Sequence, residues 1–194
     1  MQDAPRLNLD ATDLRVGLVI SAYHEEVTDR LRRGAIDAFC EAGGDKENIF
    51  EVVAPGAFEL VPLVAALVEK ELNGVVALGC VIRGETTHDE HLCRSVSQAL
   101  AQLASENGVP IGFGLLTCFS MEQAMERAGG AKGNKGEEAM NAFIVTARSL
   151  EVIEEQLASD EDEEDEDEED EVLDTEEEDN DEYEYEDEYE EEEV

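Results

Sequence analysis

"GVVALGCVI", residues 74–82, is the stretch that decides the fold. It is a run of apolar residues with no charge and no alternation between polar and apolar positions. Such a run is typical of a strand that is buried on both faces, as in a parallel sheet covered by helices on either side. Similar runs at residues 14–23, 48–54 and 109–118 predict three more strands.

Helical patterns separate these runs. Residues 24–44 carry apolar side chains at helical spacing, and the pair Gly43-Gly44 ends the pattern. Further helices are expected at residues 56–72, 86–108 and 134–157, and a short one after Ser120, where Gln123 completes a capping box. Strands that alternate with helices predict an α/β fold with a parallel sheet.

The predicted topology also indicates where a ligand would bind. In open α/β sheets, ligands bind beyond the carboxyl ends of the strands. Tyr23, residues 55–59, residues 80–88 and the residues after 118 should therefore converge at one edge.

The charge of the chain is concentrated at its C-terminal end. The chain has 52 acidic and 13 basic residues, and 27 of the acidic ones lie between residues 160 and 194, where there is no Lys, Arg or His. Such a segment cannot bury enough apolar surface to offset the loss of chain entropy. We expect an arm at 1–13, a domain at 14–158 and a disordered acidic tail at 159–194. The tail is either a solubilising segment or an electrostatic arm for a basic partner or cations.

Composition excludes several classes of function. Neither the domain nor the acidic tail offers the basic face that nucleic-acid binding needs. No apolar run is long enough to span a membrane. The N-terminus lacks the basic start and apolar stretch of a secretory signal. The four cysteines have no CxxC spacing and are expected to be reduced thiols of a cytoplasmic protein.

The stretch "RGETTHDEHLC", residues 83–93, is the strongest candidate for chemistry. Thr86 or Thr87 can cap the helix that starts there, and its free backbone N–H groups can bind an anion. His88 and His91 share a helix face, but without an HExxH motif or a second ligand cluster we expect no metal. His88, nearest the strand, is the better general acid or base. His91 is expected on the helix surface or in an interface.

Other segments leave two interpretations open. The glycine-rich "ERAGGAKGNKGEEA", residues 126–139, is either a flexible turn or an anion site with Arg127. Glu59 in "APGAFEL" either packs at a helix start or contacts a ligand. Tyr23 and Phe113 are core residues or aromatic platforms.

Together, "PGAFEL", "LGCVIRGETTH", "FGLLT", "EQAMERAGG" and "GNKGEEA" resemble the 6,7-dimethyl-8-ribityllumazine synthase family over about residues 14–157. The resemblance implies a flavodoxin-like three-layer α/β/α sandwich with strand order 2-1-3-4. It implies pentamers, in many members assembled into 60-subunit capsids, with riboflavin synthase as possible cargo. The implied reaction of riboflavin biosynthesis joins two small-molecule substrates and needs no cofactor or metal.

The resemblance also implies roles for individual residues. His88 matches the proton-transfer histidine, Arg127 the phosphate-binding arginine and Tyr23 the aromatic that stacks on the pyrimidine. Four further groups of ligands are implied: Ala57, Phe58 and Glu59 for the ribityl chain; Cys80, Val81 and Ile82 for the pyrimidine; Glu85 and Thr86 for the phosphate; and Lys135, with Phe113 of a neighbouring copy, near the ring.

This chain departs from the family at three positions and in the segment "APGAFELVP", residues 54–62, which has an added residue before its second proline. His24 replaces an asparagine, and Asp89 and His91 stand where the family commonly has apolar or aromatic residues. These changes affect the packing around His88, while every main ligand position is occupied.

Three hypotheses about function remain: a lumazine synthase, a flavin- or pteridine-binding module without catalysis, and a shell protein whose tail recruits cargo. His88 and Arg127 favour the enzyme, because passive binding of a ring needs neither.

Overall fold

A four-stranded parallel sheet forms the centre of the fold. The computed structural model describes residues 7–174, with side chains as far as residue 157. The strands β1 (Val16–Ser21), β2 (Ile49–Ala54), β3 (Gly74–Ile82) and β4 (Ile111–Cys118) lie in the order β2-β1-β3-β4. All three neighbouring pairs are parallel. The predicted α/β class and the strand order 2-1-3-4 are confirmed.

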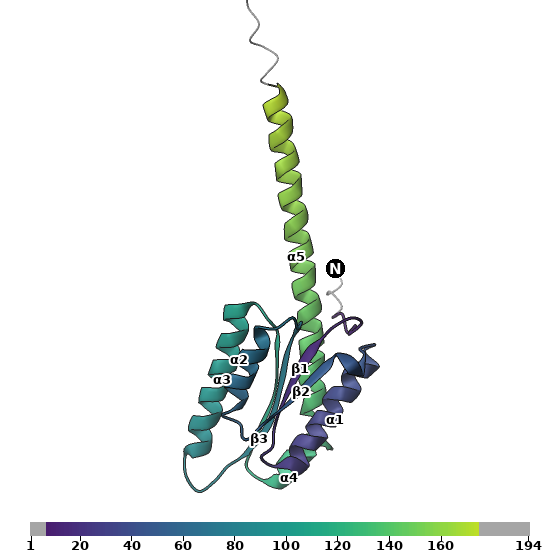
Figure 1. The fold of residues 1–194 in the computed structure, drawn as a ribbon. Helices are drawn as coiled ribbons and strands as arrows, with labels where there is room; N and C mark the ends of the chain where they lie inside the picture. Colours follow the sequence, from purple (N-terminus) through teal and green to yellow (C-terminus); the bar gives the residue numbers. More distant parts are fainter. Residues whose placement is uncertain (1–6, 175–194) are drawn as a thin grey trace, which may run out of the picture. The chain divides into compact units, whose positions relative to one another are not determined.

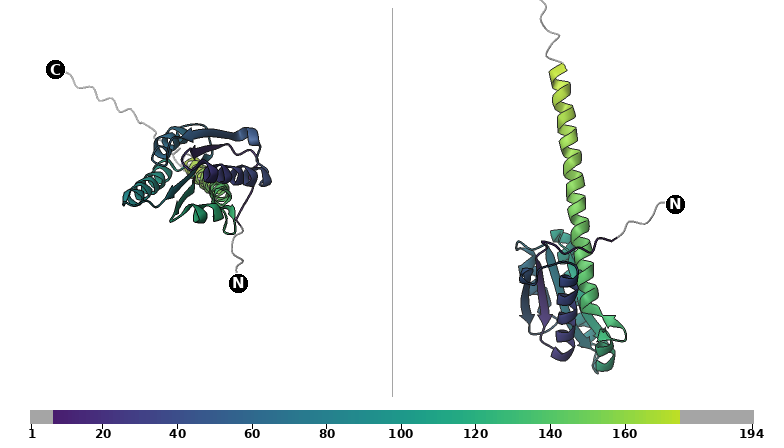
Figure 2. Two further views of the ribbon diagram at one scale, coloured as in Figure 1. Left: turned by 90° about the horizontal axis from the view of Figure 1, so that it is seen from below. Right: turned by 90° about the vertical axis from the view of Figure 1, so that its right-hand side faces the viewer.

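Helices flank the sheet on both faces. They are α1 (Glu25–Glu41), α2 (Leu60–Val68), α3 (His88–Asn107), α4 (Met121–Glu126) and α5 (Lys135–Asp174), with a 3-10 turn η1 (Lys46–Asn48) before β2. α2 and α3 cover one face, and α1, α4 and the first turns of α5 cover the other (Figures 1 and 2). The chain divides into two compact units, one ending at Glu151 and one starting at Val152, and the first holds the sheet.

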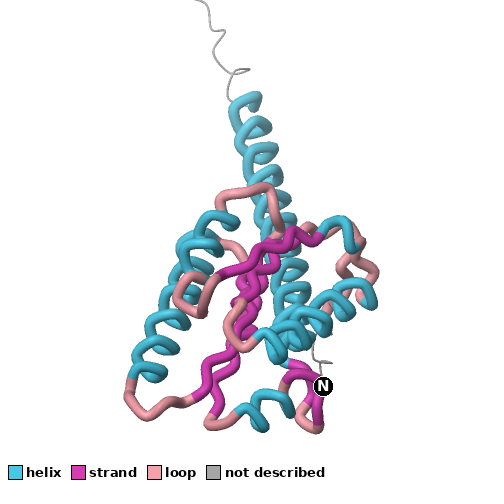
Figure 3. The backbone as a smooth tube through the Cα atoms, turned by 60° about the horizontal axis from the view of Figure 1, so that its bottom comes forward, coloured by secondary structure: helices cyan, strands magenta, loops and turns pink. Residues whose placement is uncertain are grey.

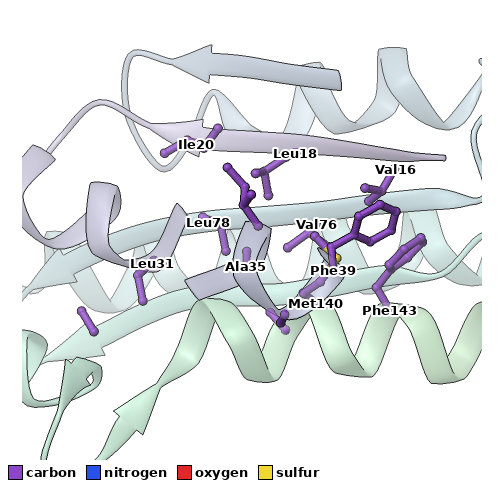
Figure 4. Packing of buried hydrophobic residues seen from close by; sticks show 14 of the residues in the cluster. Val16, Leu18, Ile20, Leu31, Ala35, Phe39, Val76, Leu78, Met140 and Phe143 are labelled. Carbon is purple, nitrogen blue, oxygen red and sulfur yellow. The ribbon is translucent and has the colours of Figure 1, made fainter. Parts of the chain in front are cut away.

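Two apolar clusters hold these layers together. In the larger one, Phe39 of α1 and Phe143 of α5 pack beside strand residues such as Val16 (Figure 4). The apolar residues that recur at helical spacing along α1 are all buried: Val27, Leu31, Ala35, Ala38 and Phe39. Each large side chain of this kind contributes about 1.5–3 kcal/mol through burial.

Strand β2 differs from the expectation that every strand is buried on both faces. Among residues 7–174 it pairs only with β1, and Phe50 and Val53 are 57% and 67% exposed. An apolar run does not distinguish an edge strand from a central one, so the sequence alone did not reveal this exposure.

The glycine-rich stretch forms an unpredicted hairpin. Strands β5 (Ala128–Gly130) and β6 (Gly133–Asn134) are antiparallel and lead directly into α5. The Asn134 side chain donates to the Arg30 carbonyl (3.0 Å) and accepts from the Gly136 N–H (2.9 Å). A Cβ added to Gly136 would lie 1.9 Å from the Leu31 carbonyl oxygen, so this glycine permits close packing of α5 on α1.

The two ends of the described chain also differ from expectation. Part of the predicted arm is packed, because Ala11 is buried and Arg148 Nε donates to the Asp10 carbonyl (2.8 Å). Helix α5 continues to Asp174. The sequence analysis instead predicts that this helix ends near Leu157 and that the chain is disordered from residue 159. A helix already nucleated gains a hydrogen bond with each added residue, and Glu has a good helix propensity. Residues 175–194 lie outside the described part.

Candidate active site

A cavity of about 560 Å³ opens at the carboxyl ends of the strands. Its walls come from the segments that follow β1, β2 and β3 and from the start of α3; Figure 3 shows these strand-to-helix connections. The lining residues are Tyr23, His24, Gly56, Ala57, Phe58, Glu59, Cys80, Val81, Ile82, Gly84, Thr86, His88, Asp89 and Leu92. The sheet topology thus brings together segments that are far apart in sequence.

Two aromatic side chains and one carboxylate line the part built by the β1 and β2 connections. Tyr23 is 66% exposed and Phe58 is 59% exposed, so neither belongs to the core. Glu59 begins α2 without a side-chain capping bond. A Cβ at Gly56 would lie 3.0 Å from Glu59 Oε2, so the carboxylate folds over this glycine. The arrangement can present flat apolar surfaces and a hydrogen-bond acceptor to one ligand.

The end of β3 supplies a wall that is chemically inert. Cys80 is buried, and burial raises the pKa of its thiol from 9.0 to about 12, with smaller contributions from Cys118 and Cys93. Burial also raises the pKa of the Cys93 thiol and of the Cys118 thiol. These three thiols are therefore protonated near neutral pH and are poor nucleophiles.

The start of α3 brings His88 into the cavity. Thr87 occupies the N-cap position without a side-chain capping bond, and Thr86 Oγ1 instead accepts from the His88 N–H at 3.4 Å. His88 is exposed to solvent. Asp89 is partly buried, and its Oδ1 atom has no hydrogen-bond partner among the described residues. An imidazole here can exchange protons with a ligand that fills the cavity.

Other residues of "RGETTHDEHLC" lie outside the cavity. Arg83 forms an ion pair with Glu90 (3.4 Å) and lies 5.6 Å from the centre of the Phe119 ring. Glu85 is exposed in the loop between two lining residues, Gly84 and Thr86. His91 is exposed on α3, which agrees with its predicted surface position. In the described residues no group of three or more His, Cys, Asp or Glu is placed to hold a metal ion.

Besides Glu85, three predicted site residues do not line the cavity of their own chain. Phe113 is near the start of β4, pairs with Ala77 in register, and is 44% exposed. Arg127 ends α4, and its Nη1 donates to the Gln123 carbonyl (3.2 Å). Lys135 begins α5, forms an ion pair with Glu138, and donates its backbone N–H to the Arg127 carbonyl (2.8 Å). The β5–β6 hairpin therefore holds these two basic residues together.

Comparison with known proteins identifies the family. The family model for 6,7-dimethyl-8-ribityllumazine synthase matches residues 13–151. The chain belongs to this family. The 6,7-dimethyl-8-ribityllumazine synthase of Streptomyces coelicolor is 43% identical over 155 residues, covering 78% of this chain and 95% of that protein. Those of Nitratidesulfovibrio vulgaris (strain DP4) and Desulfovibrio desulfuricans are 46% and 44% identical over 145 residues, each covering 74% of this chain and 92% of the relative.

Family membership confirms the predicted enzyme class: the chain has the lumazine synthase activity of riboflavin biosynthesis. The cavity adds lining residues that the sequence did not single out as ligands: His24, Gly56, Gly84, Asp89 and Leu92. The two glycines carried a usable signal, because glycines in loops at the ligand edge permit close approach of a substrate. No helix in the described part of the chain is long and apolar enough to cross a membrane.

Proposed function

We propose that this cavity is the part of the lumazine synthase active site provided by one copy of the chain, and that a second copy completes it. The reaction joins 5-amino-6-(D-ribitylamino)uracil to 3,4-dihydroxy-2-butanone 4-phosphate and releases phosphate and water. One observation carries the proposal: nine of the thirteen site residues expected from the family line a single cavity.

The chemistry of the walls suits the two substrates. The pyrimidine ring stacks on Tyr23 beside the backbone of residues 80–82, and Glu59 accepts hydrogen bonds from the ribityl hydroxyls. The phosphate of the second substrate lies at the start of α3, where Glu85 and Thr86 offer backbone N–H groups and a hydroxyl. A helix of twenty residues begins there and favours negative charge at this end.

His88 transfers protons in this scheme. The pyrimidine amine attacks the ketone carbon, and loss of water gives an imine between the substrates. The His88 imidazole then accepts the proton whose removal expels phosphate. It returns a proton when the ribitylamino nitrogen closes the ring on the remaining carbonyl, whose oxygen leaves as a second water. The imine carbon comes from one substrate and its nitrogen from the other, so no enzyme lysine forms a Schiff base.

The remaining groups come from the neighbouring copy. Phe113 is exposed on the edge strand β4, and Arg127 and Lys135 are held together at the start of α5. Arg127 pairs with the phosphate through its planar guanidinium, and Lys135 lies near the ring. Exposed apolar side chains elsewhere, such as Phe50, Val53 and Phe119, indicate that the single chain has surfaces to cover. We infer a homo-oligomer, a pentamer or a 60-subunit shell.

The direct test is an assay with both substrates that follows lumazine absorbance. We expect His88→Ala to lower kcat by about 100-fold or more, because general acid–base catalysis contributes at least this order of rate. Arg127→Ala should mainly raise the KM for the phosphate substrate. Normal kinetics in both variants would refute the roles assigned to these residues.

A mixing experiment tests the shared site. His88 and Arg127 of one chain serve different sites in this proposal, so neither variant alone can form an intact site. Oligomers reassembled from equal amounts of the two variants should recover up to about one quarter of wild-type activity, from sites that receive both intact residues. If mixing restores no activity although mixed oligomers form, the site is not shared.

The acidic segment at residues 160–194 suggests a second function, the recruitment of cargo. A segment with 27 acidic residues on every copy would give an assembly a dense negative layer that attracts basic cargo. Riboflavin synthase is one such cargo to test. Sedimentation of the assembled protein separates the alternatives, since a particle the size of one pentamer has no interior to fill. The free state of all four cysteines fits a reducing, cytoplasmic location.

A further inference from the structure

His24 has a backbone conformation that residues other than glycine adopt only rarely. Its φ is +61°. In residues 7–174 the only other non-glycine residue with a positive φ is Asp13, also at +61°. A side chain crowds the following carbonyl in this left-handed region, so such residues cluster at functional sites. His24 lines the active-site cavity, whereas Asp13 does not.

The backbone of His24 is fixed by the start of α1. Its carbonyl accepts from the Val27 N–H (2.9 Å) and the Thr28 N–H (3.1 Å). Its side chain makes no capping bond to the helix. The imidazole is therefore not needed to begin α1 and is left facing the cavity.

The imidazole instead contacts the Tyr23 ring. The ring centroids are 4.7 Å apart and the planes meet at 72°, an edge-to-face arrangement that aromatic pairs favour. The Tyr23 backbone is held by a bond from its N–H to Ser21 Oγ (3.3 Å), but its ring is largely exposed. An exposed ring loses rotational freedom when a ligand stacks on it, and that loss weakens binding.

We propose that His24 is a positioning residue that holds the Tyr23 ring ready as a platform for the flat ring of the substrate. The inference rests on the proposed function, in which Tyr23 stacks on the pyrimidine. His24 acts through Tyr23 and takes no part in proton transfer.

His24→Asn separates the ring contact from the backbone. Asparagine tolerates the left-handed conformation, so the variant removes the imidazole without straining the start of α1. We expect the KM for the pyrimidine substrate to rise roughly 2- to 12-fold, the range of one aromatic pair. The kcat, the KM for the phosphate substrate and the Tm should stay close to wild type. Asp13→Asn is the matched control, with the same φ and the same new residue outside the cavity, and should leave every value unchanged.

A double-mutant cycle with Tyr23→Ala decides the mechanism. If His24 acts through the Tyr23 ring, His24→Asn should have no further effect on the pyrimidine KM once that ring is removed. An equal effect in both backgrounds, or no effect in either, would overturn the inference. Titration of the product lumazine by its fluorescence gives a binding constant without turnover. A wild-type chain that makes no lumazine would refute the proposed function instead, and the titration would still report on His24.

Discussion

Replacing Gly136 by alanine tests how closely α5 packs on α1. The added Cβ would lie 1.9 Å from the Leu31 carbonyl oxygen and 2.9 Å from the Leu31 Cα, whereas ordinary contacts begin near 3.4 Å. The obstacle is the backbone of α1, which cannot move aside by changing a rotamer. The start of α5 must therefore shift by about 1.5 Å. Lys135 precedes Gly136 and would shift with it.

Two opposing terms set the size of the effect. Alanine favours a helix over glycine by about 1 kcal/mol. Overpacking costs about 3 kcal/mol at the upper end of its usual range, and we use this upper value because the added Cβ clashes with backbone atoms. We expect a net loss of about 2 kcal/mol, which in a chain of this size lowers the Tm by roughly 4–8 °C.

Thermal unfolding followed by circular dichroism, at matched protein concentrations, measures this loss. Gly108→Asn is the control, because Gly108 has a φ of +62° and no atom within 4 Å of an added Cβ. Asparagine accepts this conformation, so the control should unfold near the wild-type temperature. A Gly136→Ala variant that is as stable as wild type, or more stable, would refute the reasoning from close packing.

Two further predictions concern the cavity. Gly56→Ala places a Cβ 3.0 Å from Glu59 Oε2 and should displace the carboxylate, raising the KM for the ribityl substrate several-fold at an unchanged Tm; steady-state kinetics and calorimetry check this. Because burial raises the pKa of the Cys80 thiol from 9.0 to about 12, only the unfolded chain releases this proton between those pH values. Stability should therefore fall as pH rises through this window, and denaturant titrations should show a weaker fall in Cys80→Ala.

The strands and the main helices could be predicted because their patterns are local. Residues 74–82 were predicted as a strand and form β3 with the same bounds, and Ser120 Oγ accepts from the Gln123 N–H as the capping box requires. The hairpin β5–β6 was missed because strands of three and two residues are too short to show a period. Its last residue, Asn134, is held by the backbone of Arg30, a contact across 104 positions that no local pattern encodes.

The candidate site was predictable to the extent that topology determines it. Parallel strands bring their carboxyl ends to one edge, so the convergence of Tyr23, Glu59 and His88 follows from the strand pattern. The contact of His24 with Tyr23 does not, because it depends on a single backbone angle. Phe113 and Arg127 were assigned by resemblance, and a single chain leaves them outside the cavity. Their placement stays a prediction.

The uncovered edge of β2 has a consequence for a newly made chain. One side of this strand has no partner in the described residues, and Phe50 and Val53 extend the apolar surface beside it. Free edges of this kind can pair with an extended segment of another chain, so this edge exposes a newly made chain to aggregation. A net charge of −39 keeps such immature chains apart. Added salt would weaken that repulsion and raise the rate of aggregation.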